Sequence, residues 1–234
     1  FLVVVAGIFV GLQVNDWALE RENRKQETAA LERLLLESET IVAALDQQTK
    51  MTNRINRMRR AAVRFIDSEQ VIPDDDLVLR VGINTLDRFP PFIPITAAYQ
   101  ELTSAGQMQL IRSADLREKI AIFHANVESH NRLSEIFSGE GEAFWRGYKR
   151  HVIWDYNPDS TTSDILLSTY NWETMRGDED FILESIGKLR NQLVFEDSLQ
   201  ALRDLAIDMC ESIGATINRA CDPNLAGMAS PTPD

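Results

Sequence analysis

Phe1–Trp17 reads FLVVVAGIFVGLQVNDW, an apolar run with no charged residue before Asp16 that leads directly into a charged helical pattern. As an α-helix, Phe1 to Gln13 would rise about 20 Å, whereas a bilayer core of about 30 Å needs about 20 residues. Because Phe1 is not an initiator methionine, we interpret the run as the last part of a longer membrane-spanning helix. We therefore expect a transmembrane anchor at residues 1–17 that is incomplete at its N-terminus.

Two other interpretations of this run are open. A secretory signal peptide would end at a small-residue cleavage site, and no A-x-A site follows the run. A buried core helix of a soluble protein is also compatible, because short apolar runs are often of that kind. Asn15 and Trp17 favour the membrane, since Trp is enriched where bilayer meets water. We expect Trp17 at this interface and the lipid bilayer around the run.

Gly7 and Gly11 form a G-x-x-x-G pair, and Asn15 follows at the same spacing. These positions share one face of a helix. Two successive turns without side chains allow a second helix backbone to approach closely. We predict that Gly7, Gly11 and Asn15 pack against a helix of another membrane protein subunit. The alternative is chance, because Gly is common in membrane helices.

Val3–Trp17, VVVAGIFVGLQVNDW, resembles the anchor of a family of bacterial single-pass membrane proteins with no assigned function, which reads V-x-V-G-x-x-I-A/G-L-Q-V-N-N/D-W. The resemblance continues through the E-R-x-x-R-K-x-E and L-E-R-L-L-x-E patterns that follow, and through Ala97–Leu102, AAYQEL. It thus covers about the first half of the chain. It implies a short cytoplasmic N-terminus, one span and an external helical domain, and it carries over no catalytic or ligand residues.

The composition suits one folded domain plus an anchor: 234 residues, 44% hydrophobic and 26% charged. The net charge of −12 disfavours nucleic acid and anionic lipid as partners, because both need basic patches. The arginine-rich segment from Arg54 to Arg64 is interpreted as a solvated helix face with acidic neighbours.

The cysteines Cys210 and Cys221 leave two possibilities open. They could pair in an oxidising compartment. A continuous helix between them would hold them too far apart, so pairing requires the chain to turn back near Arg219–Pro223. Two free buried thiols are equally compatible with the sequence.

Strand patterns are nearly absent, and apolar residues recur mostly at three- and four-residue steps. We predict an all-α fold in which the N-terminal transmembrane helix continues into a long helix, packed with two further long helices and several short ones as an elongated helical bundle. The bundle is expected at residues 18–222 and a disordered tail at 223–234. The first expected helix is 12–72, with a possible bend at 47–54 and a stop at Pro73. A short helix follows the caps offered by Asp74–Asp76 and ends near Asn84, and the next is 95–105, capped by Thr96. Then come 113–153, with Ile136 inward and a kink at Gly139 or Gly141, and a short helix at 164–170. A connector begins at Trp172, and the last helix is 178–219, with Ile186, Leu189 and Leu193 inward.

Six aromatic residues are expected between the two later long helices: Trp145, Tyr148, Trp154, Tyr156, Tyr170 and Trp172. Packing in the core and its loops is one interpretation. The other is a surface that faces a partner protein, since Trp and Tyr are favoured at interfaces. We keep Trp145, Tyr148, Trp154, Tyr156 and Trp172 as possible partner-facing aromatics.

No pattern of a metal or catalytic site is complete. His124 and Glu128 lie one turn apart, but a zinc site needs three or four ligands, and neither His130 nor His151 falls at the right spacing. Asp155–Asp159, DYNPD, resembles the start of an EF-hand loop, yet Ser160 and Leu166 stand where Gly and Glu are needed. Nucleophile-elbow, P-loop and Rossmann motifs are missing. We predict no catalytic residue, no metal and no cofactor.

Two classes of function remain. The first is a non-catalytic accessory or structural subunit that docks through its transmembrane helix and helical periplasmic domain onto a larger inner-membrane complex, with a respiratory or photosynthetic complex as a natural host. The second is a sensor-like periplasmic helical domain that binds a small ligand between helices. The G-x-x-x-G face favours the first class. In both, the acidic domain lies in the periplasm of a Gram-negative bacterium.

Overall fold

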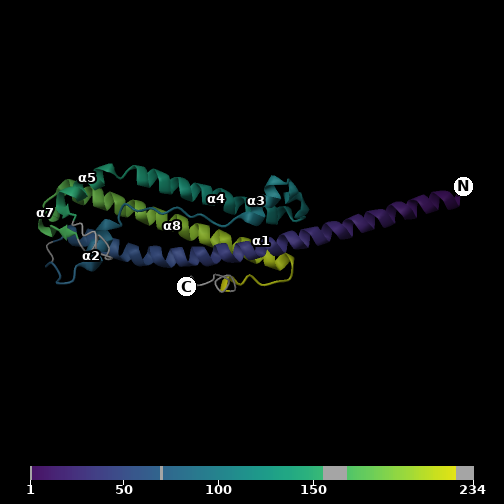
Figure 1. The fold of residues 1–234 in the computed structure, drawn as a ribbon, viewed down its shortest axis with the longest axis horizontal. Helices are drawn as coiled ribbons and strands as arrows, with labels where there is room; N and C mark the ends of the chain where they lie inside the picture. The colour runs from purple at the N-terminus through teal and green to yellow at the C-terminus, as the bar shows by residue number, and fades with distance from the viewer. Residues whose placement is uncertain (1, 69–70, 155–167, 225–234) are drawn as a thin grey trace, which may run out of the picture. The chain divides into compact units, whose positions relative to one another are not determined.

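The computed structural model describes residues 2–68, 71–154 and 168–224, and of residues 2–12 it describes the backbone alone. These residues are mostly helical, so the all-α prediction is confirmed (Figure 1). In chain order the elements are α1 Leu2–Ile66, α2 Leu77–Asn84, α3 Ala97–Ser104, the 3-10 helix η1 Gln107–Leu110, α4 Ala114–Gly139, α5 Glu142–His151, β1 Val152–Ile153, β2 Thr169–Tyr170, α7 Trp172–Arg176 and α8 Glu179–Thr216.

A search for membrane spans gives a negative result for the described chain. None of its helices contains a stretch that is long and apolar enough to cross a membrane. The transmembrane assignment of residues 1–17 therefore stays a prediction.

The described chain divides into two compact units. Unit 1 comprises residues 1–44, 94–125 and 203–234, and unit 2 comprises residues 45–93 and 126–202. The helices α1, α4 and α8 each contribute residues to both units. Each unit is therefore described separately.

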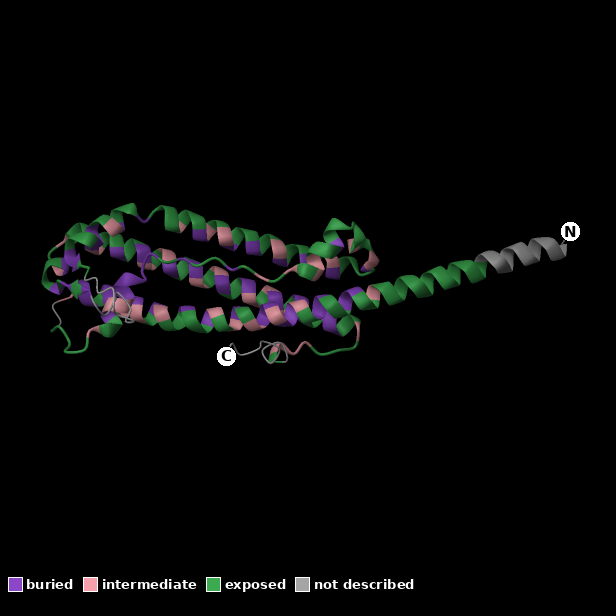
Figure 2. Cartoon of the chain, in the orientation of Figure 1, coloured by how far each residue is buried: buried purple, intermediate pink, exposed green. Residues whose placement is uncertain are grey.

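On each long helix one set of buried positions recurs at alternating steps of three and four residues, which is a heptad pattern (Figure 2). On α1 they are Leu31, Leu35, Ser38, Val42, Leu45, Thr49, Thr52, Asn56, Arg59, Val63 and Ile66. On α4 they are Leu116, Ile120, Phe123, Val127, His130 and Ser134. On α8 they are Phe181, Ser185, Lys188, Gln192, Phe195, Leu199, Leu202, Ala206, Met209 and Ile213. The heptad positions of unit 1 are almost entirely apolar, whereas those of unit 2 include many polar side chains.

In unit 1, a carboxylate from α1 caps the start of α3. Glu37 accepts hydrogen bonds from the backbone N–H groups of Ala98, at 2.6 Å, and Tyr99, at 3.2 Å. These are N–H groups of the first helical turn, which have no partner within the helix. The predicted cap, Thr96, stands at the N-cap position but makes no capping bond with its side chain. Burial raises the pKa of Glu37, and the two backbone hydrogen bonds oppose this rise.

Unit 1 also contains the end of α8, where the chain reverses. Asn218 has a left-handed φ of 57°, and the N–H of Arg219 donates to the carbonyl of Gly214. A Cβ at Gly214 would lie 2.5 Å from the Arg219 carbonyl oxygen, so the returning chain needs glycine there. This turn brings Cys210 and Cys221 together as a disulfide with a Cα–Cα distance of 5.7 Å. Of the two possibilities left open by the sequence, a disulfide or two free thiols, the structure shows the disulfide.

In unit 2, one core cluster joins the C-terminal part of α1 with α2, α5, α7 and the start of α8. An extended segment at Phe89–Phe92 packs beside α4 through backbone hydrogen bonds to side chains. Asn131 bonds both the N–H and the carbonyl of Phe92, at 2.8 and 2.9 Å, and the Ser134 hydroxyl donates to the carbonyl of Phe89. This pairing lets a proline-rich segment satisfy its backbone groups without a strand neighbour.

Several predicted boundaries in unit 2 are wrong. The first helix ends at Ile66, before Pro73. The predicted helix 113–153 is two helices, because Gly141 lies under Asp87, where a Cβ would come within 2.1 Å of a carboxylate oxygen. The described part of the predicted helix 164–170 is strand β2, which pairs with β1. The connector predicted at Trp172 is the helix α7.

The predicted apolar stripes are correct in part. Ile136, Ile186 and Leu193 were expected inside and are exposed by 48%, 42% and 37%. Leu189 is only partly buried. The heptad positions beside them hold Ser134, Ser185, Lys188 and Gln192, so in this part of the helices the buried face carries polar side chains. The last predicted helix ends at Thr216, and of the predicted tail only Pro223 and Asn224 are described.

Candidate functional site

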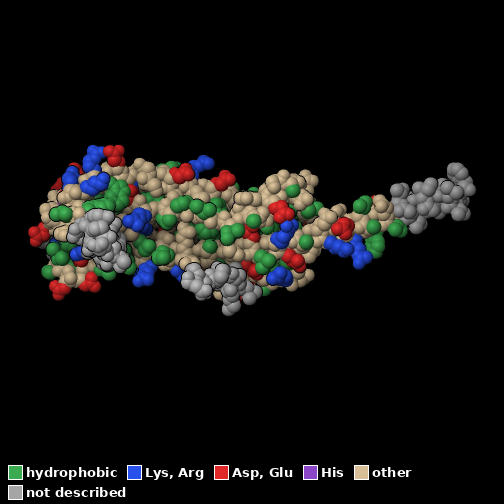
Figure 3. All heavy atoms as spheres, in the orientation of Figure 1, with side chains coloured by type: hydrophobic (Ala, Val, Ile, Leu, Met, Phe, Trp, Pro, Cys, Tyr) green, Lys and Arg blue, Asp and Glu red, His purple; other side chains and the backbone are tan. Residues whose placement is uncertain are grey.

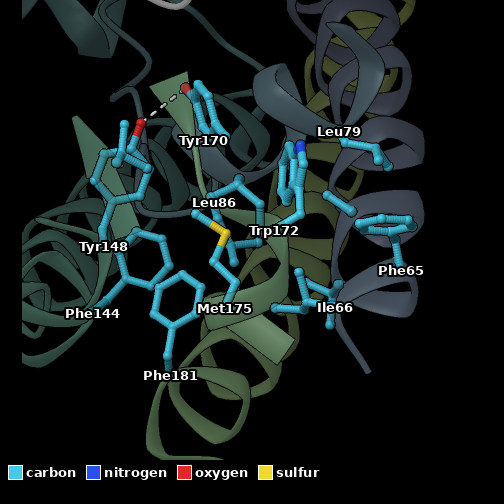
Figure 4. Close-up of a cluster of buried hydrophobic side chains, with 14 residues drawn as sticks. Phe65, Ile66, Leu79, Leu86, Phe144, Tyr148, Tyr170, Trp172, Met175 and Phe181 are labelled. Atoms are coloured by element: carbon cyan, nitrogen blue, oxygen red, sulfur yellow. Dashed lines mark hydrogen bonds between the residues drawn. The ribbon is translucent and has the colours of Figure 1, made fainter. Parts of the chain in front are cut away.

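The predicted aromatic residues that the structure describes do meet in unit 2, and Figure 4 shows three of them, Tyr148, Tyr170 and Trp172. The Tyr148 ring centroid lies 5.0 Å from that of Trp145, 6.4 Å from Trp154 and 6.3 Å from Tyr170. Tyr170 stacks on Trp172 at 5.2 Å. The cluster therefore joins α5, β2 and α7. Tyr156 lies outside the described residues.

Burial separates these residues into two groups. Tyr148 and Trp172 are exposed by only 1% and 3%, so core packing explains them and their assignment as partner-facing side chains is wrong. Trp145 is partly buried against the core cluster, and Trp154 is 55% exposed. Of the predicted partner-facing residues that the structure describes, Trp145 and Trp154 alone could contact a partner without opening the core.

The polar groups of Tyr148, Tyr170 and Trp172 each have a hydrogen-bond partner at the edge of the aromatic cluster. The hydroxyls of Tyr148 and Tyr170 lie 3.0 Å apart, and Asn84 donates to Tyr148 at 3.0 Å. Burial raises the pKa of Tyr170, and its bond to Tyr148 adds to the rise. The Trp172 indole N–H donates to Asp76 at 2.7 Å. The raised pKa keeps the Tyr170 hydroxyl neutral at neutral pH, so this group does not act as a general base.

His151 provides the most enzyme-like geometry. Its Nδ1 lies 2.9 Å from the Thr174 hydroxyl and its Nε2 lies 2.8 Å from the Asp178 carboxylate. Burial raises the pKa of Asp178, but hydrogen bonds from His151 and the Phe181 N–H, with the charge of Arg150, lower it overall. Asp178 also caps α8 by accepting from Phe181 at 3.1 Å.

The Thr–His–Asp contact performs a structural task that accounts for all of its bonds. It ties the end of α5 to α7 and to the start of α8, and the Thr174 hydroxyl also lies 3.1 Å from the Asn171 carbonyl. Nucleophilic catalysis would further need donors aimed at a developing oxyanion. We therefore assign His151, Thr174 and Asp178 a structural role, which is to hold the ends of these helices together.

A second polar network lies in the core of unit 2 around Arg59, which is 4% exposed. Its guanidinium donates to the carbonyls of Thr85 and Arg88, at 2.5 and 3.1 Å. It also donates to Asn56 at 2.7 Å and Gln192 at 2.5 Å. Burial lowers the pKa of Arg59 to about 10, helped by the charge of Arg88 and opposed by Glu196. The interpretation of Arg59 as part of a solvated face is wrong.

Lys188 and Gln192 extend this network along α8. Gln192 donates to the carbonyls of Leu86 and Arg88, at 2.8 and 3.1 Å. Lys188 Nζ lies 2.5 Å from Asp87 Oδ1 as a buried ion pair without hydrogen-bond geometry, and it donates to the Phe137 carbonyl at 3.1 Å. The polar side chains therefore satisfy the backbone of the turn after α2, which has no helical partners.

The remaining histidines are isolated from one another as metal ligands. His124 stacks on Tyr99 with ring centroids 3.5 Å apart in unit 1. His130 is buried in unit 2, with its Nδ1 3.1 Å from the Ser198 hydroxyl. Burial lowers the pKa of both to about 4. Within the described ranges, no group of three or more His, Cys, Asp or Glu side chains could hold a metal ion. The EF-hand-like segment 155–159 lies outside these ranges.

The predicted membrane residues all belong to α1. Gly7 and Gly11 lie in the part whose backbone alone is described, and Asn15 and Trp17 are exposed. Trp17 is 62% exposed, with the Arg21 guanidinium carbon 5.7 Å from its ring centroid. The packing and interface roles of these residues stay predictions.

Comparisons with known proteins add no template: no family model, no curated protein and no solved structure matches the chain. Function must therefore be inferred from the molecule itself.

Charged side chains of both signs are interspersed on the face shown in Figure 3. That mixture differs from the continuous basic stripe that binds nucleic acid.

Proposed function

We propose that the protein is a non-catalytic accessory subunit that docks onto a larger inner-membrane complex through its N-terminal helix. The proposal places residues 1–17 in the membrane and the rest of the chain in the periplasm. A respiratory or photosynthetic complex is the kind of host we expect. One observation carries the proposal: from Gln13 to Gln26, α1 is exposed on all sides.

A helix of this kind needs a partner or a bilayer to stay ordered. Isolated helices are marginal in water, and most helical stability comes from a packed face. Within this stretch Val14, Trp17 and Leu19 are exposed by 59%, 62% and 55%. The ion pair from Arg24 to Glu20, at 2.5 Å, lies fully in solvent and adds little to the stability of the helix. This stretch of α1 follows the apolar run and precedes the part of the helix that packs in unit 1. Its exposed apolar side chains therefore make it a natural contact for a second protein.

The disulfide supports the periplasmic side of the proposal. Disulfides persist in oxidising compartments such as the periplasm and are rare in the cytosol. Cys210–Cys221 closes a short loop in unit 1 and leaves no free cysteine in the described chain. A reporter enzyme fused after Asp234 should be active in the periplasm. Activity only in the cytoplasm would contradict the proposed topology.

Site-specific crosslinking tests the docking contact. A photoreactive amino acid in place of Leu19 should give one discrete crosslinked protein in intact membranes. The same group in place of Val194, which is 44% exposed on α8, is the matched control and should not capture that protein. Equal products from both positions, or none at Leu19, would contradict docking through α1.

The predicted glycine face allows a second test. Gly11→Leu adds a side chain where helices are expected to meet, and it should lower the amount of partner that co-purifies in mild detergent. Val10→Leu alters a residue off the Gly7–Gly11–Asn15 face and serves as the control. A partner retained at the wild-type ratio with Gly11→Leu would show that this face is not the contact.

A further inference from the structure

A groove in unit 2 runs between α5 and the start of α8 and has a volume of about 310 Å³. The α5 side of the groove is basic, with Arg146 and Arg150, and the α8 side is acidic, with Asp180 and Glu184. Between these two charged walls the groove is lined by residues without charge, which include Ala143, Gly147 and Leu183.

The acidic wall has no cation of its own. The carboxylates of Asp180 and Glu184 are exposed and make no ion pair or hydrogen bond with the described residues. On the basic wall, Arg146 and Arg150 each donate one hydrogen bond to a neighbouring carboxylate, at 2.9 and 2.7 Å. A guanidinium has five N–H donors, so both arginines keep donors for a further carboxylate.

The apolar part of the groove is open as well. Leu183 is 67% exposed, although it stands between two charged walls. The residues of α5 that line the groove between the arginines, Ala143 and Gly147, are small. On the next turn of α8, a Cβ added at Gly187 would meet nothing within 4 Å. Small residues on both helices therefore leave space in which another helix can approach closely.

The helices α5 and α8 run antiparallel along the groove. Gly147 lies against the Phe181 ring, and Arg150 pairs with Asp178 at 2.7 Å. Rising residue numbers on α5 therefore match falling numbers on α8. By the same count, Arg146 stands opposite residue 182.

This pairing fixes the heights of the charges along the groove. Arg146 is offset from Glu184, and Arg150 from Asp180, by about two residues, which at about 1.5 Å per residue is about 3 Å along the axis. Each arginine thus lies at nearly the same height as one carboxylate of the opposite wall, within the reach of its long side chain.

We propose that this groove is the contact between two copies of the chain, related by a two-fold axis parallel to α8. Rotation about such an axis keeps every residue at its own height, so the basic wall of each copy meets the acidic wall of the other. Arg146 then faces Glu184 of the partner subunit, and the two Leu183 side chains meet at the axis. A two-fold contact needs a self-complementary surface, and a groove with one wall of each charge is such a surface.

The inference goes beyond the docking role of α1 and does not rest on it, because none of the groove residues belongs to α1. The same axis places the N-termini of both copies at one height. Two chains joined in this way can therefore be anchored in one membrane.

Cysteine crosslinking tests the position of the axis. Both cysteines of the chain are in the disulfide, so Leu183→Cys adds one free thiol. Mild oxidation of the full chain in detergent should convert this variant into a disulfide-linked dimer on a non-reducing gel. Leu193→Cys, at a position that is 37% exposed on the same helix but outside the groove, is the control and should stay monomeric. Equal amounts of dimer from both variants, or none from Leu183→Cys, would overturn the proposal.

Charge reversal tests the pairing of the walls, with sedimentation of the full chain in detergent as the measurement of the dimer dissociation constant. Arg146→Glu and Glu184→Arg should each raise this constant by about tenfold or more, because each brings like charges together. An equimolar mixture of the two variants should form a mixed dimer with the wild-type constant, since each charge then meets its opposite. Lys149→Glu makes the same change of charge on α5 outside the groove and should leave the constant unchanged.

Thermal melting of each variant shows whether it is folded. Wild-type chain that sediments as a monomer at every concentration would overturn the proposal, and this is also the result expected if the groove held a helix of another protein. A dimer whose dissociation constant neither reversal changes would place the contact elsewhere on the chain and refute the groove.

Discussion

Replacing Arg59 by Met should strongly destabilise unit 2, because it removes donors that the core cannot replace. After the change, the side-chain oxygens of Asn56 and Gln192 lose their hydrogen bonds. The Thr85 carbonyl keeps its bond from the Arg88 N–H, and the Arg88 carbonyl keeps its bond from Gln192. Two acceptors therefore remain buried and unsatisfied.

The magnitude follows from these two losses. Each unsatisfied buried acceptor costs about 1 to 3 kcal/mol. Methionine recovers part of this cost, because a buried guanidinium is itself unfavourable, as its lowered pKa shows. We expect a net loss of about 2 to 4 kcal/mol in the free energy of unfolding, because the groups left behind are neutral and only their two hydrogen bonds are lost.

Urea unfolding of the full chain in detergent, followed by far-ultraviolet circular dichroism, measures this loss. Arg57→Met is the matched control: Arg57 is exposed on the same helix and its change should stay within about 0.5 kcal/mol. Arg59→Lys keeps the charge but loses the planar fork and should fall between the two. If Arg59→Met costs less than about 1 kcal/mol, the network does not hold the turn after α2.

Four further measurements test the rest of the fold. Leu202→Ala should cost about 2 to 5 kcal/mol in unfolding free energy because Leu202 is 1% exposed, whereas partly buried Leu189→Ala should cost about 1 to 2 kcal/mol. The folded pKa of His130, about 4, lies below its unfolded value, so its contribution is complete above about pH 6.5 and is lost as pH falls towards 4; His130→Asn should flatten the stability–pH curve there. Reducing Cys210–Cys221, which are 11 residues apart, should lower the unfolding free energy by about 3 kcal/mol in urea titrations. EDTA should leave the melting temperature unchanged, since a structural metal would contribute folding free energy.

The long helices could be predicted from the sequence because their signal is periodic. Leu31, Leu35, Val42 and Leu45 repeat at heptad steps, and no Gly or Pro occurs in α1 between Leu12 and its end. A kink was expected at Gly139 or Gly141, and the helix ends at Gly139 and begins again at Glu142. A complete break was not expected, because it depends on Asp87 packing over Gly141. A contact between residues that distant in sequence leaves no mark in the local pattern.

The disulfide shows a similar limit. The sequence contains Cys210 and Cys221, and helix geometry shows that they can pair only if the chain turns back between them. The turn itself depends on Gly214, whose missing Cβ makes room for the Arg219 carbonyl. Neither a glycine nor an asparagine at this point of a sequence specifies a reversal, so the cysteine pairing stayed open until the chain path was known.

The polar network was missed for a deeper reason. Hydrophobic periodicity depends only on the polarity of side chains and their spacing. On that basis Arg59 is one of several arginines predicted to lie on a solvated helix face. The partners of Arg59, Gln192 and Lys188 are mainly backbone carbonyls of the turn after α2 and of the end of α4. Every residue carries such a carbonyl, so nothing in the sequence distinguishes the ones that need an outside donor. A polar residue at a heptad position, where an apolar one is expected, is the signal that could have found them. Asn56, Arg59, Lys188 and Gln192 all carry it.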